Sequence, residues 1–212
     1  MRSYLSIAIL MFIVALGSGC ADPAANKQKA TVANAQQESN SPKAGTETLV
    51  ISPENSKVDF VAAKITRSHN GSFKQFAGQV DLAANSLPDS RVTIDIETAS
   101  VETDEPQLTG HLKTADFFDV AKFPKATFVS TKIEPGATGS DAYTVTGNFD
   151  LHGVKKSISF PATIKLSPDS VSVAAEFAIN RRDFGIVYAG KADDLIRDGV
   201  VIKLNLNVPR KK

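Results

Sequence analysis

The most constraining feature of this sequence is an alternation of apolar and polar side chains that runs from residue 143 to residue 166. It falls into two segments, 143–151 and 157–166, with His152 and Gly153 in a turn between them. Successive side chains of a β-strand point to opposite faces, so each segment predicts a strand with one buried and one wet face. The interior that such strands enclose must be filled by side chains or by a ligand.

The same alternation recurs through the rest of the chain after residue 49. It predicts further strands at Lys57–Thr66, Phe73–Leu82, Arg91–Thr98, Ala126–Ile133, Ser170–Ile179 and Val200–Val208. Ser68–Gly71 is expected to form a polar turn with His69 on the surface, and Pro106–Ala115 a short helix. About eight antiparallel strands suit a closed barrel just wide enough for one small ligand, although a two-sheet sandwich would show similar alternation.

The first twenty residues resemble an export signal. Arg2 supplies a positive start, and Leu5–Leu16 is an apolar core too short for a comfortable membrane span. Gly17-Ser18-Gly19 then precedes Cys20, the single cysteine of the chain, as in the lipobox of bacterial lipoproteins, although Gly17 stands where that motif usually has Leu. We expect Cys20 to be lipidated and to anchor an exported protein to a membrane in the periplasm or cell envelope. Ordinary cleavage and an uncleaved anchor are the alternatives.

The expected mature chain divides into a tether and one domain. Residues 21–48 are polar and predict a disordered tether, because they cannot bury enough surface to offset their ordering entropy. Residues 49–212 are long enough for one domain with a substantial core. Without Arg2 the 24 basic residues become 23, which equals the 23 acidic residues. This neutrality, with no basic block, argues against a nucleic-acid partner.

Motifs for catalysis and metal binding are missing from the sequence. It has no Gly-x-Ser-x-Gly, no His-Glu-x-x-His, no phosphate-binding glycine loop and no Cys-x-x-Cys. The three histidines are widely spaced, and Asp193-Asp194 with Asp198 lacks the glycine and terminal Glu of a calcium loop. We therefore expect no enzymatic activity, no metal and no cofactor, and packing rather than an internal disulfide must hold the fold.

Three ordered segments resemble the YceI-like family. They are HLKTADFFDV followed by KFPKATF within 111–128, GNFDLHGVKK at 147–156 and INRRDFGI at 179–186. The resemblance covers roughly residues 50–208. It implies an all-β fold, an extended antiparallel lipocalin-like barrel with the short helix near one mouth. It also implies non-covalent binding of a long-chain amphiphile, such as a polyisoprenoid, an isoprenoid quinone or a fatty amide.

The inward-facing apolar residues are the candidates for the tunnel that this resemblance implies. The set is Phe60, Phe76, Val80, Val92, Ile94, Ile96, Leu108, Leu112, Phe117, Phe118, Phe128, Val145, Phe149, Ile158, Phe160, Val173, Phe177, Ile179, Ile202 and Leu204. Each buried methylene of a lipid chain would contribute about 0.8 kcal/mol, so few directional contacts are needed. The alternative is a core filled by these same side chains.

Five polar residues are candidates for contacts with a lipid head group: His111, Asp116, His152, Arg181 and Arg182. An arginine pair would meet a diphosphate or carbonyl through charge-assisted hydrogen bonds. The alternative for the arginines is that an Arg–Asp cluster ties loops together, and a turn histidine such as His152 is usually structural.

Three functions follow from these expectations. The first is storage or transport of an amphiphilic lipid in the cell envelope, with a homodimer possible where two tunnels share one long ligand. The second is an envelope interaction protein with a filled barrel. The third is an enzyme that acts on a lipid inside the tunnel through His111 or Asp116.

Overall fold

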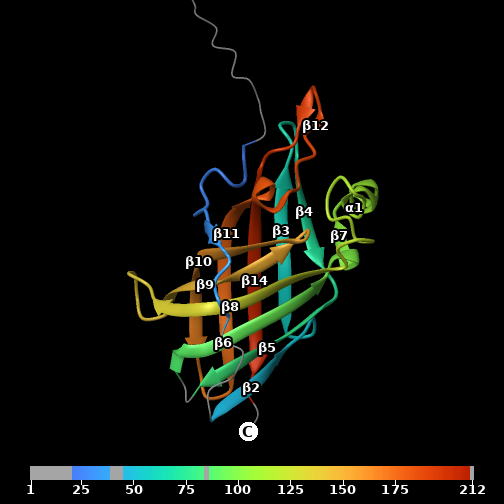
Figure 1. The fold of residues 1–212 in the computed structure, drawn as a ribbon. Helices are drawn as coiled ribbons and strands as arrows, with labels where there is room; N and C mark the ends of the chain where they lie inside the picture. The colour runs from blue at the N-terminus through green and yellow to red at the C-terminus, as the bar shows by residue number, and fades with distance from the viewer. Residues whose placement is uncertain (1–20, 39–44, 84–85, 211–212) are drawn as a thin grey trace, which may run out of the picture.

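The fold is dominated by one curled antiparallel sheet, seen in a computed structural model that describes residues 21–38, 45–83 and 86–210 (Figure 1). Side by side, its strands are β2 (Thr46–Ile51), β5 (Phe76–Ala83), β6 (Ser86–Glu97), β8 (Lys125–Pro135), β9 (Ala142–Leu151), β10 (Val154–Leu166), β11 (Ser170–Asn180), β14 (Gly199–Pro209), β3 (Ser56–Ala63), β4 (Ser68–Phe73) and β7 (Val101–Thr103). An ion pair of 2.8 Å between Arg210 and Glu47 draws the start of β2 towards the end of β14. The sheet therefore forms a half-open barrel.

The all-β fold class predicted from the sequence is confirmed. Each of the eight predicted strands is present, with boundaries shifted by a few residues. The predicted helix is also present as α1 (Pro106–Leu112), which begins with proline and ends in a tight turn where the Lys113 amide meets the carbonyls of Gly110 and His111. His152 (φ 55°) and Gly153 (φ 73°) form the two-residue turn between β9 and β10, and positive φ at both positions is what such a hairpin requires.

The interior is packed solid at the end of the sheet that carries β2. The side chains there are at most 1 % exposed and come from four strands: Leu49, Ile51, Leu82, Val171 and Val208. Five of the predicted tunnel residues belong to the packed core or pack against it, and they line none of the three cavities described below: Phe76, Val80, Val92, Val145 and Val173. The alternative of a core filled by side chains thus describes this part of the barrel.

The predicted turn at Ser68–Gly71 is wrong, because these residues belong to strand β4. Gly71 lies opposite Phe60 of β3, and a Cβ atom on Gly71 would be 2.1 Å from Phe60 Cζ. Glycine here leaves room for the phenylalanine ring to lie across the neighbouring strand. His69 is only 4 % exposed, so its predicted surface position is also wrong.

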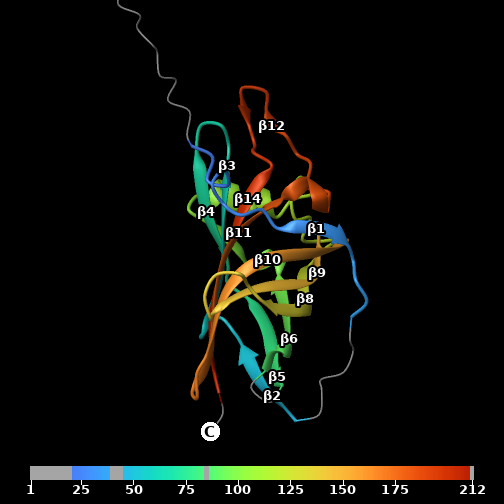
Figure 2. The ribbon, with the colours of Figure 1, turned by 90° about the vertical axis from the view of Figure 1, so that its left-hand side faces the viewer.

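The prediction of a disordered tether is wrong for residues 21–38. Strand β1 (Thr31–Asn34) pairs with residues 156–159 of β10, as Figure 2 shows. The partner strand β11 meets β10 only at 163–166, so β1 occupies an edge that would otherwise be open. A segment can form backbone hydrogen bonds to an open strand edge without being apolar. The polar composition of residues 21–38 was therefore a poor guide to whether they are ordered. Residues 46–48, the end of the predicted tether, form the start of β2.

The segment between β11 and β14 contains short elements of its own. Residues Arg181–Phe184 form a 3-10 helix, and β12 (Gly190–Lys191) pairs with β13 (Asp194–Leu195) in a small hairpin. A second 3-10 helix, Thr98–Ser100, leads into β7. Among the described residues, no helix has the length and hydropathy needed to cross a membrane. The predicted signal segment and Cys20 lie outside the described residues.

Candidate functional site

Two adjoining apolar cavities lie inside the curl of the sheet. The inner cavity has a volume of about 80 Å³ and the outer cavity, nearer α1, about 100 Å³. Asp59 in the inner wall and Arg181 in the outer wall are the charged residues among otherwise apolar linings. The two cavities share the wall residues Phe60, Phe73, Ile96, Phe149, Ile179 and Ile202. This continuous apolar interior is suited to a hydrocarbon chain.

Phenylalanine rings decide how much room the cavities offer. Phe160 stacks on Phe177 with ring centroids 4.1 Å apart, and Phe73 contacts both Phe60 (5.8 Å) and Phe118 (5.6 Å). Pockets for small ligands usually measure about 300–1,000 Å³, well above either cavity. A long ligand would therefore enter by displacing rings, and Phe60, Phe73 and Phe149 stand in the wall that the cavities share.

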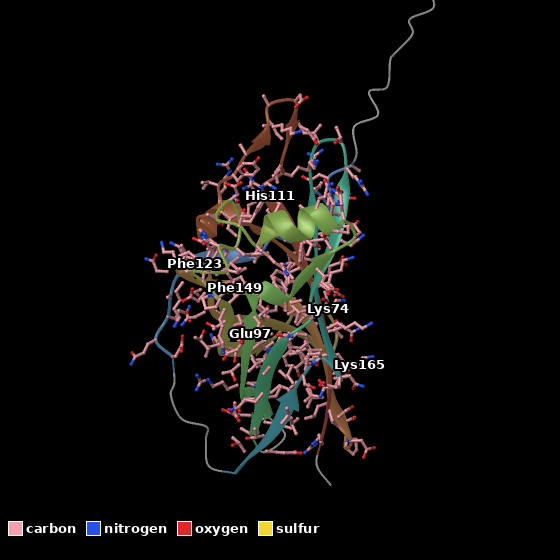
Figure 3. All side chains as sticks on the ribbon, turned by 90° about the vertical axis from the view of Figure 1, so that its right-hand side faces the viewer. Lys74, Glu97, His111, Phe123, Phe149 and Lys165 are labelled. Atoms are coloured by element: carbon pink, nitrogen blue, oxygen red, sulfur yellow. The ribbon has the colours of Figure 1, made fainter. Side chains whose placement is uncertain are left out.

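A polar vestibule of about 320 Å³ adjoins the outer cavity at the α1 end of the barrel. The vestibule and the outer cavity share the wall residues Phe117 and Ile196, so the polar vestibule leads into the apolar interior. In Figure 3, His111 of α1 lies nearer the β12 end of the molecule than Phe149 does. The lining comes from β4, α1, β12, β13 and the segments that flank them: Lys64, His69, Glu105, Gln107, Leu108, His111, Phe117, Tyr188, Gly190, Lys191, Asp194 and Ile196.

An ion pair and a histidine–carboxylate hydrogen bond hold two carboxylates at or beside the vestibule. Lys64 Nζ lies 2.9 Å from Asp194 Oδ2, and this hydrogen bond, with that from Thr66, lowers the pKa of Asp194. His69 Nδ1 lies 2.8 Å from Asp104 Oδ1. Desolvation alone would raise the pKa of Asp104, but the hydrogen bonds from His69 and the Asn70 amide outweigh it and lower that pKa. Both carboxylates are therefore ionised at neutral pH.

His111 stands in the vestibule wall and is held by Asp116 and two aromatic rings. Its Nε2 lies 2.8 Å from Asp116 Oδ2. Its ring packs edge-on against Phe117 (4.9 Å) and Tyr188 (5.2 Å). The fold thus places the predicted pair His111 and Asp116 at the polar mouth of the apolar interior.

Comparison with known proteins places this architecture in a family. Residues 49–208 match the YceI-like domain. The chain belongs to the YceI-like family. A UPF0312 protein of Pseudomonas putida (strain W619) is 34 % identical over 123 residues, which are 55 % of this chain and 63 % of that protein. A UPF0312 protein of Pseudomonas fluorescens (strain SBW25) is 32 % identical over 133 residues, 60 % of this chain and 68 % of that protein. The match thus spans less than two thirds of the first relative's own length and just over two thirds of the second's.

Solved structures share the fold. Burkholderia cenocepacia BcnA has a TM-score of 0.66 and 25 % identity, covering 74 % of this chain and 98 % of BcnA. A polyisoprenoid-binding domain from Saccharophagus degradans, implicated in plant cell wall breakdown, has a TM-score of 0.63 at 18 % identity. That match covers 78 % of this chain and 99 % of the domain. The curled YceI-like sheet is therefore common to proteins with little sequence in common.

In this YceI-like barrel Arg181 is engaged by its own loop. The side chain is buried, and it donates to the carbonyls of Ile186 (Nη1, 2.7 Å) and Arg197 (Nε, 3.1 Å). A third bond runs from Nη2 to Asp198 Oδ1 at 3.0 Å. Burial lowers the pKa of Arg181, but Asp198 opposes this, and a guanidinium stays protonated in proteins. The geometry favours the alternative that this cluster ties the loop together.

Arg182 and His152 lie away from the cavities. Arg182 is exposed and pairs with Asp198 at 2.7 Å. The ring of His152 packs against Phe123 with centroids 4.6 Å apart, at the β9–β10 turn. Among the predicted head-group residues, His111 therefore lines the vestibule with Asp116 bonded to it, and Arg181 lines the outer cavity.

Most of the predicted tunnel residues do line a cavity. In the inner or outer cavity lie Phe60, Ile94, Ile96, Leu112, Phe117, Phe118, Phe128, Phe149, Ile158, Phe160, Phe177, Ile179, Ile202 and Leu204, and Leu108 lines the vestibule. Sequence reasoning missed Phe73, which stands in the shared wall, and the vestibule residues Lys64, His69 and Tyr188. Phe73 was detectable as the first residue of a predicted strand. Lys64 lies in the predicted strand 57–66 but just beyond the end of β3, and His69 and Tyr188 come from a short strand and a loop that carry no periodicity.

Proposed function

We propose that this protein binds an amphiphilic lipid without covalent chemistry, with the hydrocarbon chain in the two apolar cavities and the head group in the vestibule. The observation that carries the proposal is the continuity of an apolar interior with a polar mouth. Family membership and a structural neighbour described as polyisoprenoid-binding support lipid binding in general.

The energetics favour a long chain as ligand. Each methylene removed from water contributes about 0.8 kcal/mol, so a chain that fills both cavities gains several kcal/mol before the cost of moving rings. The ligand classes that fit are a polyisoprenoid, an isoprenoid quinone or a fatty amide. The Lys64–Asp194 ion pair and the hydrogen-bonded pair His111 and Asp116 would receive a head group of modest size through hydrogen bonds.

The proposed role is that of a carrier or reservoir in the bacterial cell envelope, without catalysis. The apolar segment Leu5–Leu16 and the small residues before Cys20 support export and lipidation. Among the described residues, no group of three His, Cys, Asp or Glu side chains could hold a metal ion. Binding and release of the lipid would then be the whole activity.

A cavity-filling variant tests the proposal. Ile202 lines both cavities, so Ile202→Phe is expected to weaken binding of a fluorescent polyene fatty acid at least tenfold, with folding checked by circular dichroism. Val50→Phe is the matched control, because Val50 is exposed on β2 far from the cavities, and its affinity should stay unchanged. Equal affinity of the two folded variants, or no uptake by the parent protein, would favour the interaction protein with a filled barrel.

A further inference from the structure

Three of the four large apolar side chains that are exposed in the described residues lie at one end of the barrel. The large hydrophobic residues exposed within the described ranges are Val50, Ile65, Val187 and Leu195. Ile65 (42 % exposed) lies in the β3–β4 turn, Leu195 (44 %) lies on β13, and Val187 (58 %) lies in the loop that leads to β12. We call residues 64–67 and 187–195 the tip. Exposed apolar side chains that gather in one region of a surface are a candidate interaction site.

Backbone and side-chain bonds join the two parts of the tip into one unit. The Ile65 amide donates to the Leu195 carbonyl at 3.1 Å. Lys64 pairs with Asp194 at 2.9 Å, and Thr66 donates to the other oxygen of the same carboxylate at 2.8 Å. Ile65 and Leu195 are therefore presented side by side on a fixed scaffold.

The vestibule is walled by the tip. Lys64, Tyr188, Lys191 and Asp194 belong to the tip and line the vestibule. An apolar surface around the polar mouth is the arrangement expected of a protein that meets lipid at that mouth. In Figure 1 the β12 end of the molecule lies opposite the end that carries β2, where the core is packed solid.

The N-terminal segment fixes the start of the described chain next to the tip. Ala24 is buried against Val61, Ala178 and Val201. Asp22 Oδ2 lies 3.7 Å from Arg197 Nη1, two residues beyond Leu195 along the chain. Residues 1–20 precede this point, and their sequence holds the apolar run Leu5–Leu16 and Cys20. Two residues of extended chain span at most about 7 Å, so a lipid on Cys20 would join the protein close to the tip.

We propose that the tip docks on the surface of a lipid bilayer, with Ile65, Leu195 and Val187 inserted at the head-group boundary and the vestibule facing the membrane. Lys191 adds a cation to this face for which the described residues show no ion pair. Transfer of a lipid between bilayer and vestibule rests on the proposed function. The proposed contact between the tip and a bilayer is independent of the proposed function.

The absence of tryptophan from the sequence allows a direct test with single reporters. Leu195→Trp reports on the tip, and Val50→Trp, at the opposite end and of similar exposure to Val187, is the matched control. The full-length variants are mixed with vesicles of phosphatidylethanolamine and phosphatidylglycerol, with or without bromine on the acyl chains. Apolar residues at a membrane interface lie about 5–10 Å inside it, so bromine should quench about half or more of the Leu195→Trp emission.

The control variant decides how the result is interpreted. Strong quenching of Leu195→Trp with little quenching of Val50→Trp supports the docked orientation, and Ile65→Trp serves as a second tip reporter if Leu195→Trp fails to fold. Equal quenching at both ends, or none at the tip, would overturn it. A blue shift of tip emission that grows with protein concentration without vesicles would assign the tip to a second copy of the chain and also overturn it. Emission does not depend on bound cargo, so this test can fail while lipid binding succeeds.

Discussion

The substitution Gly71→Ala tests the packing of the shared cavity wall. A Cβ atom at position 71 would lie 2.1 Å from Phe60 Cζ and 2.5 Å from Phe60 Cε1. Carbon atoms in good contact are about 3.5 Å apart, so the Phe60 ring must move by about 1.4 Å. Phe60 lines both cavities, and its displacement brings the ring further into the space proposed for the lipid.

The expected magnitude follows from the cost of overpacking. An added methyl in a packed core destabilises by about 1–3 kcal/mol, and for a domain of this size each kcal/mol lowers Tm by about 2–4 °C. We therefore expect Gly71→Ala to lower Tm by about 2–12 °C and to weaken uptake of a fluorescent polyene fatty acid. Thermal unfolding followed by circular dichroism measures the first effect, and fluorescence titration the second.

Two further variants make this prediction specific. Gly110→Ala is the matched control, because a Cβ there meets nothing within 4 Å and the position lies inside α1. It should raise stability by about 0.5–1 kcal/mol, as alanine does in a helix. Phe60→Leu combined with Gly71→Ala should cost less than the sum of the two single changes, because the clash is relieved. A Gly71→Ala protein as stable as the parent, or additive effects in the double variant, would refute the reasoning.

Three further predictions concern the loop, the acid range and the N-terminal segment. Arg181→Ala leaves the carbonyls of Ile186 and Arg197 without their side-chain donor and removes one of the two arginines paired with Asp198, so it should destabilise by about 3 kcal/mol in urea unfolding, whereas Arg182→Ala should cost less than about 1 kcal/mol; equal costs would contradict the structural role. The pKa of Asp104 is lowered in the folded state, so its contribution to stability is present above the unfolded value of about 3.9 and is lost as pH falls below it. Asp104→Asn should therefore flatten the fall in Tm below about pH 4, and an unchanged acid profile would count against the His69–Asp104 pair. Asn148 exchanges hydrogen bonds with the backbone of Gln36 at 2.8 and 2.7 Å, so Asn148→Ala should speed amide hydrogen exchange in residues 31–38; unchanged exchange there would show that β1 pairing alone holds the segment.

The sequence predicted the long strands well, for a physical reason. A strand with one buried face must alternate, and 143–151 and 157–166 became β9 and β10 with small shifts at their ends. The short strands β1 and β4 were not predicted, because pairing through backbone hydrogen bonds does not require a particular pattern of side chains. Strand β1 joins a free edge of β10, and β4 reads as a polar turn, since Ser68, Asn70 and Gly71 are all common in turns.

The sequence predicted many of the residues that line the candidate site but not the shape of its cavities. Alternation identifies which residues face inward, and Phe149 and Ile202 indeed line both cavities. Alternation does not show which inward residues pack together and fill the interior. Val80 of β5 and Leu49 of β2 are an example, because they pair across the two strands within the packed core. The vestibule depends on contacts between segments far apart in the chain, such as Lys64 with Asp194. No local pattern encodes such contacts.

The most direct test of the lipid-binding account is native mass spectrometry of the intact protein isolated from its membrane fraction, with organic extraction of its cargo. The account predicts a non-covalent adduct, in a ratio of one lipid to one chain, that is reduced in Ile202→Phe and retained in Val50→Phe. A mass that shows only the protein, together with no uptake of added isoprenoid quinone or fatty amide, would contradict the account.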